Sequence, residues 1–293
     1  MKRSSGEKIF NVFNIVILGA FTLCIVIPVL YVVKVSLETG PKGLYNISLI
    51  PKQPSLIFYK MILQKKNISN SFWISVQITL IGTVFSMFFE TMGAYAISSR
   101  SLPGRSFMTY MLIVPMMFSG GIIPLYLVVK YVGLMNSFWA MIIPSCISGW
   151  NILLIRNYFW SVPDSLRESA RIDGAGEFTV FARILIPLAR PVLAAIGLFT
   201  LVGYWNSFYN ALMFISDPKK YPFQLVLREM ITLIQSMDNQ MMQAGLSQQL
   251  LANVDSESVS SAMIIVSIIP ILLVYPFLQR FFVKGIMVGS IKG

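Results

Sequence analysis

The side chains that most enzymes use for acid–base or metal chemistry are scarce in this sequence. Its 293 residues include no histidine, 12 acidic residues, and two cysteines that both lie inside apolar runs, Cys24 and Cys146. Histidine is the commonest general base and metal ligand, and two isolated cysteines indicate neither a metal site nor a disulfide framework. No G-x-x-x-x-G-K-[ST] run that could cradle phosphates is present. We therefore expect no catalytic residue, no metal site and no cofactor bound by this chain.

One carboxylate, that of Glu90, lies within a long apolar stretch. It precedes Arg100 by ten residues, or roughly 15 Å along a helix. A charge at such a depth in a membrane costs on the order of 2.5–3.5 kcal/mol, so Glu90 should face a polar path or another subunit, and we weight these two equally. No second acid or histidine accompanies it, which disfavours an intramembrane enzyme.

A second group of polar and aromatic side chains follows at residues 204–210. Trp205, Phe208 and Tyr209 recur at i, i+3 and i+4, and Asn206 and Asn210 form a neighbouring amide stripe. Aromatic faces beside hydrogen-bonding groups suit a sugar, which has C–H faces and a rim of hydroxyls. The same pattern is also typical of an aromatic belt at a membrane interface.

The elements that position these residues are predicted to be membrane helices. The chain is 56% hydrophobic and 12% charged, with a mean hydropathy of +0.71, which is too apolar for a soluble globule of this length. About 20 apolar residues cross the roughly 30 Å hydrocarbon layer. Six stretches meet this standard, at about 9–35, 72–97, 107–129, 134–155, 188–214 and 259–282. The sequence predicts an all-α polytopic membrane protein, with six transmembrane helices in one domain over residues 1–293.

Arginine gives the orientation of the spans, whereas lysine does not separate the two sides. Arginines near span ends mark the cytoplasmic face, and only Arg228 falls on the other face; the rest are Arg3, Arg100, Arg105, Arg156, Arg167, Arg171, Arg183, Arg190 and Arg280. Both termini are then cytoplasmic. The net charge of +11 is scattered between apolar runs, without the basic stripe of a nucleic-acid-binding protein.

Residues 163–187 form a charge-rich loop between two predicted spans, on the cytoplasmic side. Ser165 and Glu168 have the spacing of a capping box, which predicts that a helix begins there. Gly174 permits a bend or a close backbone approach. A second short helix should follow and end at Pro187, because apolar residues recur at i, i+3, i+4 and i+7: Phe178, Phe181, Ala182 and Leu185.

The order of residues in this loop resembles the EAA loop of permease subunits in binding-protein-dependent ABC importers. The matching residues are Glu168, Ala170, Asp173, Gly174, Ala175, Phe181, Ile184 and Pro187, and Ser169 stands where the family usually has a second alanine. The resemblance implies a cytoplasmic coupling helix that docks into an ATPase subunit. The first six of these residues would form the ATPase-coupling site, while ATP and Mg would be bound by the ATPase.

Further segments resemble carbohydrate-type permeases: Leu49 to Tyr59, Gly93 to Ala96 with Arg100, and the tail from Gln279 to Gly293. The segment from Met116 to Gly121 is similar to the branch associated with larger oligosaccharides, and its Ser119-Gly120-Gly121 is interpreted as a hinge or close-packing site. The resemblance favours a carbohydrate, and this segment an oligosaccharide, as the solute. The candidate residues for its path are those selected above from their pattern and position: Trp205, Asn206, Tyr209 and Glu90.

The resemblance also implies partners in the cell membrane: a homologous second permease, two ATPase subunits, an extracytoplasmic solute-binding protein, the carbohydrate and the lipid bilayer. The external loop at about 215–258 is long enough to serve as a docking surface. The alternatives are an importer permease for a non-sugar solute, an intramembrane enzyme, and a passive scaffold. A scaffold would not need a glycine-hinged pair of cytoplasmic helices.

Overall fold

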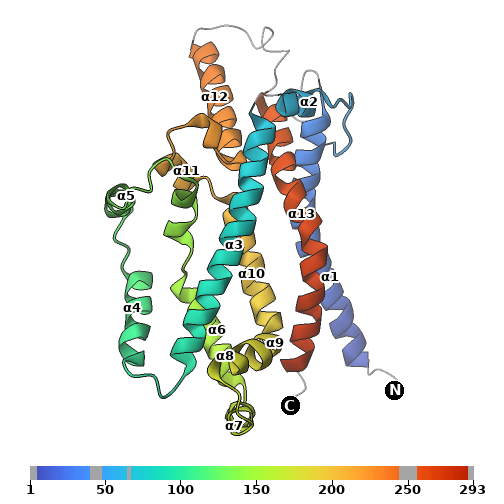
Figure 1. Cartoon of the computed structure of the whole chain (residues 1–293). Coiled ribbons are helices and arrows are strands. Elements are labelled where there is room, and N and C mark those ends of the chain that lie inside the picture. Colours follow the sequence, from blue (N-terminus) through green and yellow to red (C-terminus); the bar gives the residue numbers. More distant parts are fainter. Residues whose placement is uncertain (1–4, 40–47, 65–66, 244–255, 290–293) are drawn as a thin grey trace. The chain divides into compact units, whose positions relative to one another are not determined.

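A computed structural model describes residues 5–39, 48–64, 67–243 and 256–289. All regular secondary structure in these ranges is helical (Figure 1), apart from one isolated β-bridge between Glu38 and Pro54. The prediction of an all-α chain is therefore confirmed. The chain divides into two compact units, residues 1–66 with 227–270 and residues 67–226 with 271–293.

The first unit contains α1 (Ser5–Leu37), α2 (Ile57–Gln64), most of α12 (Phe223–Gln243) and the first part of α13 (Ser256–Gly289). Hydrogen bonds join α13 to the end of α1, where the Ser258 hydroxyl donates to the carbonyls of Val35, at 2.9 Å, and Glu38, at 3.1 Å. Lys34 and Glu38 form a buried ion pair beside them. The apolar body of α1 is exposed, as expected of a helix that meets lipid.

The second unit carries the residues of interest. Its helices are α3 (Ile68–Ser98), α4 (Arg105–Met117), α5 (Ile122–Tyr131), α6 (Gly149–Ser161), α7 (Asp164–Ile172), α8 (Glu177–Thr179), α9 (Ile186–Leu188), α10 (Arg190–Asn206) and α11 (Tyr209–Phe214). Short 3₁₀ turns occupy Phe138–Met141, Ile143–Ser145 and Pro218–Lys220, and a π-helical segment, η3, covers Val180–Leu185. The long helix α3 packs against α6 and α10 (Figure 1).

A close approach between α3 and α10 holds this unit together. A Cβ atom on Gly82 would lie 2.8 Å from the ring of Tyr204, so only glycine leaves room for that ring. The Tyr204 hydroxyl lies 2.9 Å from that of Ser86. In a membrane the hydrophobic effect does not drive helices together, and small residues at their interface allow the close packing that holds them. The small side chains of α3 therefore fix where α10, and the residues that follow it, can lie.

Three helical segments are long and apolar enough to span a membrane, namely Phe10–Leu37, Ile68–Ser98 and Glu257–Pro276. Two bent pairs raise the number to five: Phe138–Ser145 with Gly149–Ser161, bent by 51°, and Glu177–Leu188 with Arg190–Asn206, bent by 80°. The described residues thus contain three to five candidate spans, and the predicted number of six is not reached. The difference lies at 107–129, where α4 and α5 are separated by residues 118–121.

Candidate coupling loop and transport path

The loop between α6 and α10 begins with α7. This helix starts at Asp164, directly after Pro163, and no side chain caps its first turn. The predicted capping box is therefore wrong, because Ser165 is already helical and a cap residue must precede the helix. Asp164 instead places a negative charge in the first turn, where it interacts favourably with the helix dipole.

The end of α7 depends on Gly174. Its φ is +82°, the left-handed region that disfavours residues with a Cβ. The Gly174 amide donates to the Arg171 carbonyl, at 3.0 Å, and the Ala175 amide donates to the Ala170 carbonyl, at 2.9 Å, which together form a Schellman motif. No atom lies within 4 Å of the place where a Cβ on Gly174 would be. Of the two roles predicted for Gly174, the structure shows the bend.

The second helix of the loop is irregular. It runs through α8, η3 and α9 to Leu188, and α10 begins at Arg190. Pro187 does not end it, contrary to the prediction, because the proline follows the π-helical segment, where the regular ladder of backbone hydrogen bonds is already interrupted. The chain turns by 80° between these helices and α10.

Four side chains that the sequence analysis did not assign to the coupling loop's function attach α7 to the rest of the unit: Arg167, Arg171, Glu177 and Tyr95. The buried guanidinium of Arg167 donates to the Phe159 carbonyl. Arg171 pairs with Glu177 at 2.8 Å, and the Tyr95 hydroxyl of α3 donates to the same carboxylate. The Tyr95 hydrogen bond and the Arg171 charge lower the pKa of Glu177. The one available signal was the spacing of Arg167 and Arg171, which places both on one face of α7.

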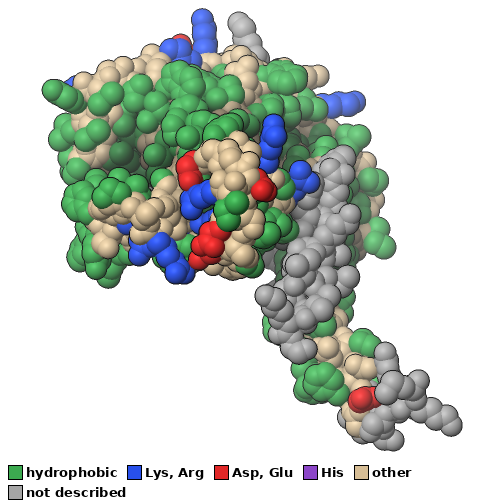
Figure 2. Space-filling view, turned by 60° about the horizontal axis from the view of Figure 1, so that its bottom comes forward, with side chains coloured by type: hydrophobic (Ala, Val, Ile, Leu, Met, Phe, Trp, Pro, Cys, Tyr) green, Lys and Arg blue, Asp and Glu red, His purple; other side chains and the backbone are tan. Residues whose placement is uncertain are grey.

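The outer surface of the loop combines charged and apolar side chains. Ile172 is 86% and Phe178 is 75% exposed. The residues expected to couple to an ATPase differ in burial: Glu168, Asp173 and Gly174 are exposed, Ala170 and Ala175 are half-buried, and Phe181 is half-buried with its ring centroid 5.0 Å from that of Tyr95. Acidic and basic side chains gather at the middle of the face that Figure 2 shows. The loop therefore presents both charged and apolar side chains to its surroundings, on a backbone that the Schellman motif holds in place.

The residues expected along a transport path are not brought onto one face. Helix α10 ends at Asn206, and α11 begins at Tyr209, so the predicted aromatic stripe is interrupted at Ser207 and Phe208. Trp205 is only 4% exposed, and its ring centroid lies 5.8 Å from that of Phe72 and 6.2 Å from that of Phe223. Asn206 and Tyr209 are exposed.

Glu90 has its hydrogen-bonding partners within the same unit. It is 1% exposed, and its Oε1 accepts from the Ser148 amide, at 2.9 Å, and from Asn151 Nδ2, at 3.1 Å. Ser148 is the N-cap of α6, so the carboxylate lies at the positive end of a helix dipole. Asn151 Nδ2 also lies 3.5 Å from the Thr200 hydroxyl of α10. In this structure Glu90 ties α3 to α6, an arrangement that the sequence analysis did not consider.

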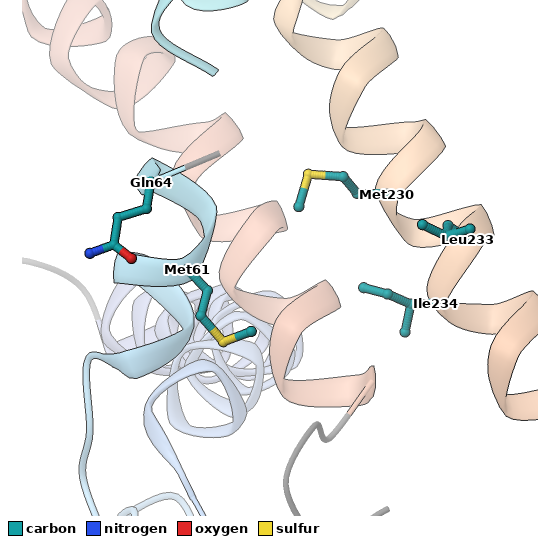
Figure 3. Close-up of a pocket in the computed structure, with 5 residues that line it drawn as sticks. All are labelled: Met61, Gln64, Met230, Leu233 and Ile234. Atoms are coloured by element: carbon teal, nitrogen blue, oxygen red, sulfur yellow. The ribbon is translucent and has the colours of Figure 1, made fainter. Parts of the chain in front are cut away.

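The first unit has a groove of about 440 Å³ between α2 and α12 (Figure 3). Met61 and Gln64 line one side, and Met230, Leu233 and Ile234 line the other. A lining with one amide and no other hydrogen-bonding side chain does not suit a sugar, which needs several polar partners. We assign the groove no role.

These features define a class of protein, a helical membrane subunit with a structured loop. Comparison with known proteins agrees with this class. The family "binding-protein-dependent transport system inner membrane component" matches residues 91–288. Protein LplC of Bacillus subtilis is 37% identical over 100% of this chain and 98% of its own length. The polygalacturonan/rhamnogalacturonan transport system permease protein YtcP of the same organism is 38% identical over 98% of this chain and 99% of its own length.

A solved structure, of a bacterial ABC transporter involved in the import of the acidic polysaccharide alginate, is 30% identical, with a TM-score of 0.81 over 96% of this chain and 99% of its own. The chain thus belongs to the family of inner-membrane components of binding-protein-dependent transport systems. It is an ABC transporter permease.

Proposed function

We propose that the chain forms half of the translocation path in an ATP-driven importer of oligosaccharides. The observation that carries this proposal is the geometry of α7, an exposed helix ended by a Schellman motif at Gly174, at the position of the EAA-like motif. A rigid, exposed helix on the cytoplasmic side can transmit the movement of a separate ATPase to the spans. Glu168 and Asp173, both exposed, would act as contact groups.

The full assembly in this proposal contains a second homologous permease, two ATPase subunits that bind ATP and Mg, and an extracytoplasmic binding protein. The family name, which specifies binding-protein-dependent transport, supports the last of these. The chain would cross the cell membrane six times with both termini in the cytoplasm, and α4 and α5 would together form the third span. The arginines at the α7 end of the second unit support this orientation.

An oligosaccharide is favoured as the substrate because of the relatives' described substrates, polygalacturonan or rhamnogalacturonan and alginate. Both contain acidic sugars, so oligogalacturonides are suitable first probes. Asn206 and Tyr209 remain candidates for contact with the sugar because they are exposed. Trp205 would support them from the packed interior, and Glu90 would act by holding α3 against α6. A permease for a non-sugar solute is the alternative, which a panel of solutes would detect.

A photocrosslinking amino acid at Ile172, which is 86% exposed on α7, tests the coupling role. We expect the assembled complex to yield an adduct with the ATPase subunit. The matched control is the same amino acid at Tyr131, which is 93% exposed at the end of α5, and it should give no such adduct. An ATPase adduct from position 131, or none from position 172 in an intact complex, would contradict the assignment of α7.

A further inference from the structure

The segment between α4 and α5 leaves the helical conformation within a predicted span. Phe118 has extended backbone angles, φ −123° and ψ 100°. Gly121 has φ 84° and ψ −179°, a combination that is essentially restricted to glycine. No atom of the described residues lies within 4 Å of a Cβ built on Gly120 or Gly121, so no other part of the described chain packs closely on these two glycines. The glycines here allow a break in the helix.

This break leaves backbone groups without partners. The Phe118 amide donates to the Val114 carbonyl, at 2.9 Å, and the Gly121 amide donates to the Ser119 hydroxyl, at 3.2 Å. Within the part of the chain that the structure describes, no group accepts a hydrogen bond from the amides of Ser119 and Gly120. All residues from 114 to 125 are exposed. These amides are therefore available to a molecule outside the chain.

The position of the break matters if α4 and α5 form one span. Counting from Arg105, the 13 residues of α4 are roughly 20 Å long, and the 10 residues of α5 add roughly 15 Å on the other side. The break then lies inside a hydrocarbon layer roughly 30 Å thick. Non-helical backbone is tolerated at that depth only where protein buries it or where it lines a water-filled cavity. Lipid cannot be its neighbour.

We propose that residues 118–121 line the water-filled path and form a sugar-binding subsite. Phe118, which is 72% exposed, would stack on the C–H face of a sugar ring. The amides of Ser119 and Gly120 would donate to sugar hydroxyls, and the Ser119 hydroxyl would add a further partner. Burial by a second permease is less suited to this segment, because its adjacent glycines do not have the spacing that lets two helices pack closely. The proposal rests on the proposed oligosaccharide import.

Labelling of introduced cysteines tests whether water reaches the break. The background carries Cys24→Ser, because Cys24 is exposed and Cys146 is buried. In the complete importer in liposomes, Ser119→Cys is compared with Leu127→Cys on α5, since both positions are exposed in this chain. A charged methanethiosulfonate should label the Ser119→Cys importer severalfold faster, and oligogalacturonides with the binding protein should slow that labelling. Equal, slow labelling of both variants, or labelling of Ser119→Cys by membrane-soluble maleimide alone, overturns the proposal.

A second variant keeps the proposal testable without cysteines. Phe118→Ala removes a ring that is 72% exposed, so assembly should be unaffected while the KM for oligogalacturonide import rises severalfold. An unchanged KM in a fully assembled complex contradicts the subsite. If the native importer carries oligosaccharides but both tests fail, the subsite alone is wrong; if the native importer carries none, the proposed function is wrong and the subsite with it.

Discussion

Substitution of Gly174 by alanine isolates the effect of one backbone angle on coupling. The φ of this residue is +82°, and no atom lies within 4 Å of the added Cβ, so the substitution causes no clash. Its cost is the left-handed conformation alone, about 1–2 kcal/mol for a residue with a Cβ. A cost of this size lowers the equilibrium ratio of the native turn to other conformations about 5–30-fold. The orientation of the residues after α7 would change accordingly.

The matched control for this substitution is Gly176→Ala. Gly176 lies two residues further on, as the N-cap of α8, and also has free space around its Cβ position, but its φ of −70° is ordinary for any residue. In the reconstituted complex, Gly174→Ala should reduce ATP hydrolysis stimulated by the loaded binding protein severalfold, and Gly176→Ala should leave it near the native rate. Gly174→Asn should be intermediate, because asparagine tolerates the left-handed region. Equal activities of the two alanine variants, with equal assembly, would refute this reasoning.

Three further experiments test the packing of the second unit. Glu90→Leu leaves buried donors unpaired, at about 1–3 kcal/mol each, and should lower the thermal midpoint of the purified complex more than Glu90→Gln; equal midpoints would argue against the hydrogen bonds to α6. Trp205→Ala should reduce complex yield, because truncating a buried tryptophan costs about 3–5 kcal/mol, whereas Tyr209→Ala should preserve yield and change sugar preference. Gly82→Ala should destabilise the complex by about 1–3 kcal/mol through overpacking against Tyr204, and an unchanged midpoint would contradict the close approach of α3 and α10.

The features that local backbone chemistry determines were predictable from the sequence. Gly174 stands where a turn needs a positive φ, and the apolar runs require helices in a membrane. The helix start was misplaced because Ser165 and Glu168 match a capping box by spacing alone, while the observed N-cap, Pro163, lies two residues before Ser165. Ser119-Gly120-Gly121 marked a point where the helix is interrupted, since Gly121 permits the backbone angles of the break; its role as a hinge stays a prediction.

Features that depend on tertiary contacts were not predictable from the sequence. The partners of Glu90 lie 58 and 61 residues away, at Ser148 and Asn151, and no local pattern connects them. The burial of Trp205 follows from rings on α3 and α12. The break between α10 and α11 falls at Ser207 and Phe208, neither of which is a glycine or a proline, so the spacing of the aromatic residues suggested a continuous helix.

ATP-dependent uptake tests the central claim most directly. Liposomes containing this chain, the second permease and the ATPases, supplied with the binding protein and labelled oligogalacturonides, should accumulate sugar only when ATP is present on the ATPase side. Uptake should stop when this chain is omitted, and a panel of amino acids and peptides should not be carried. Sugar uptake that is independent of ATP or of this chain, or ATP-driven uptake restricted to a non-sugar solute, would contradict the account.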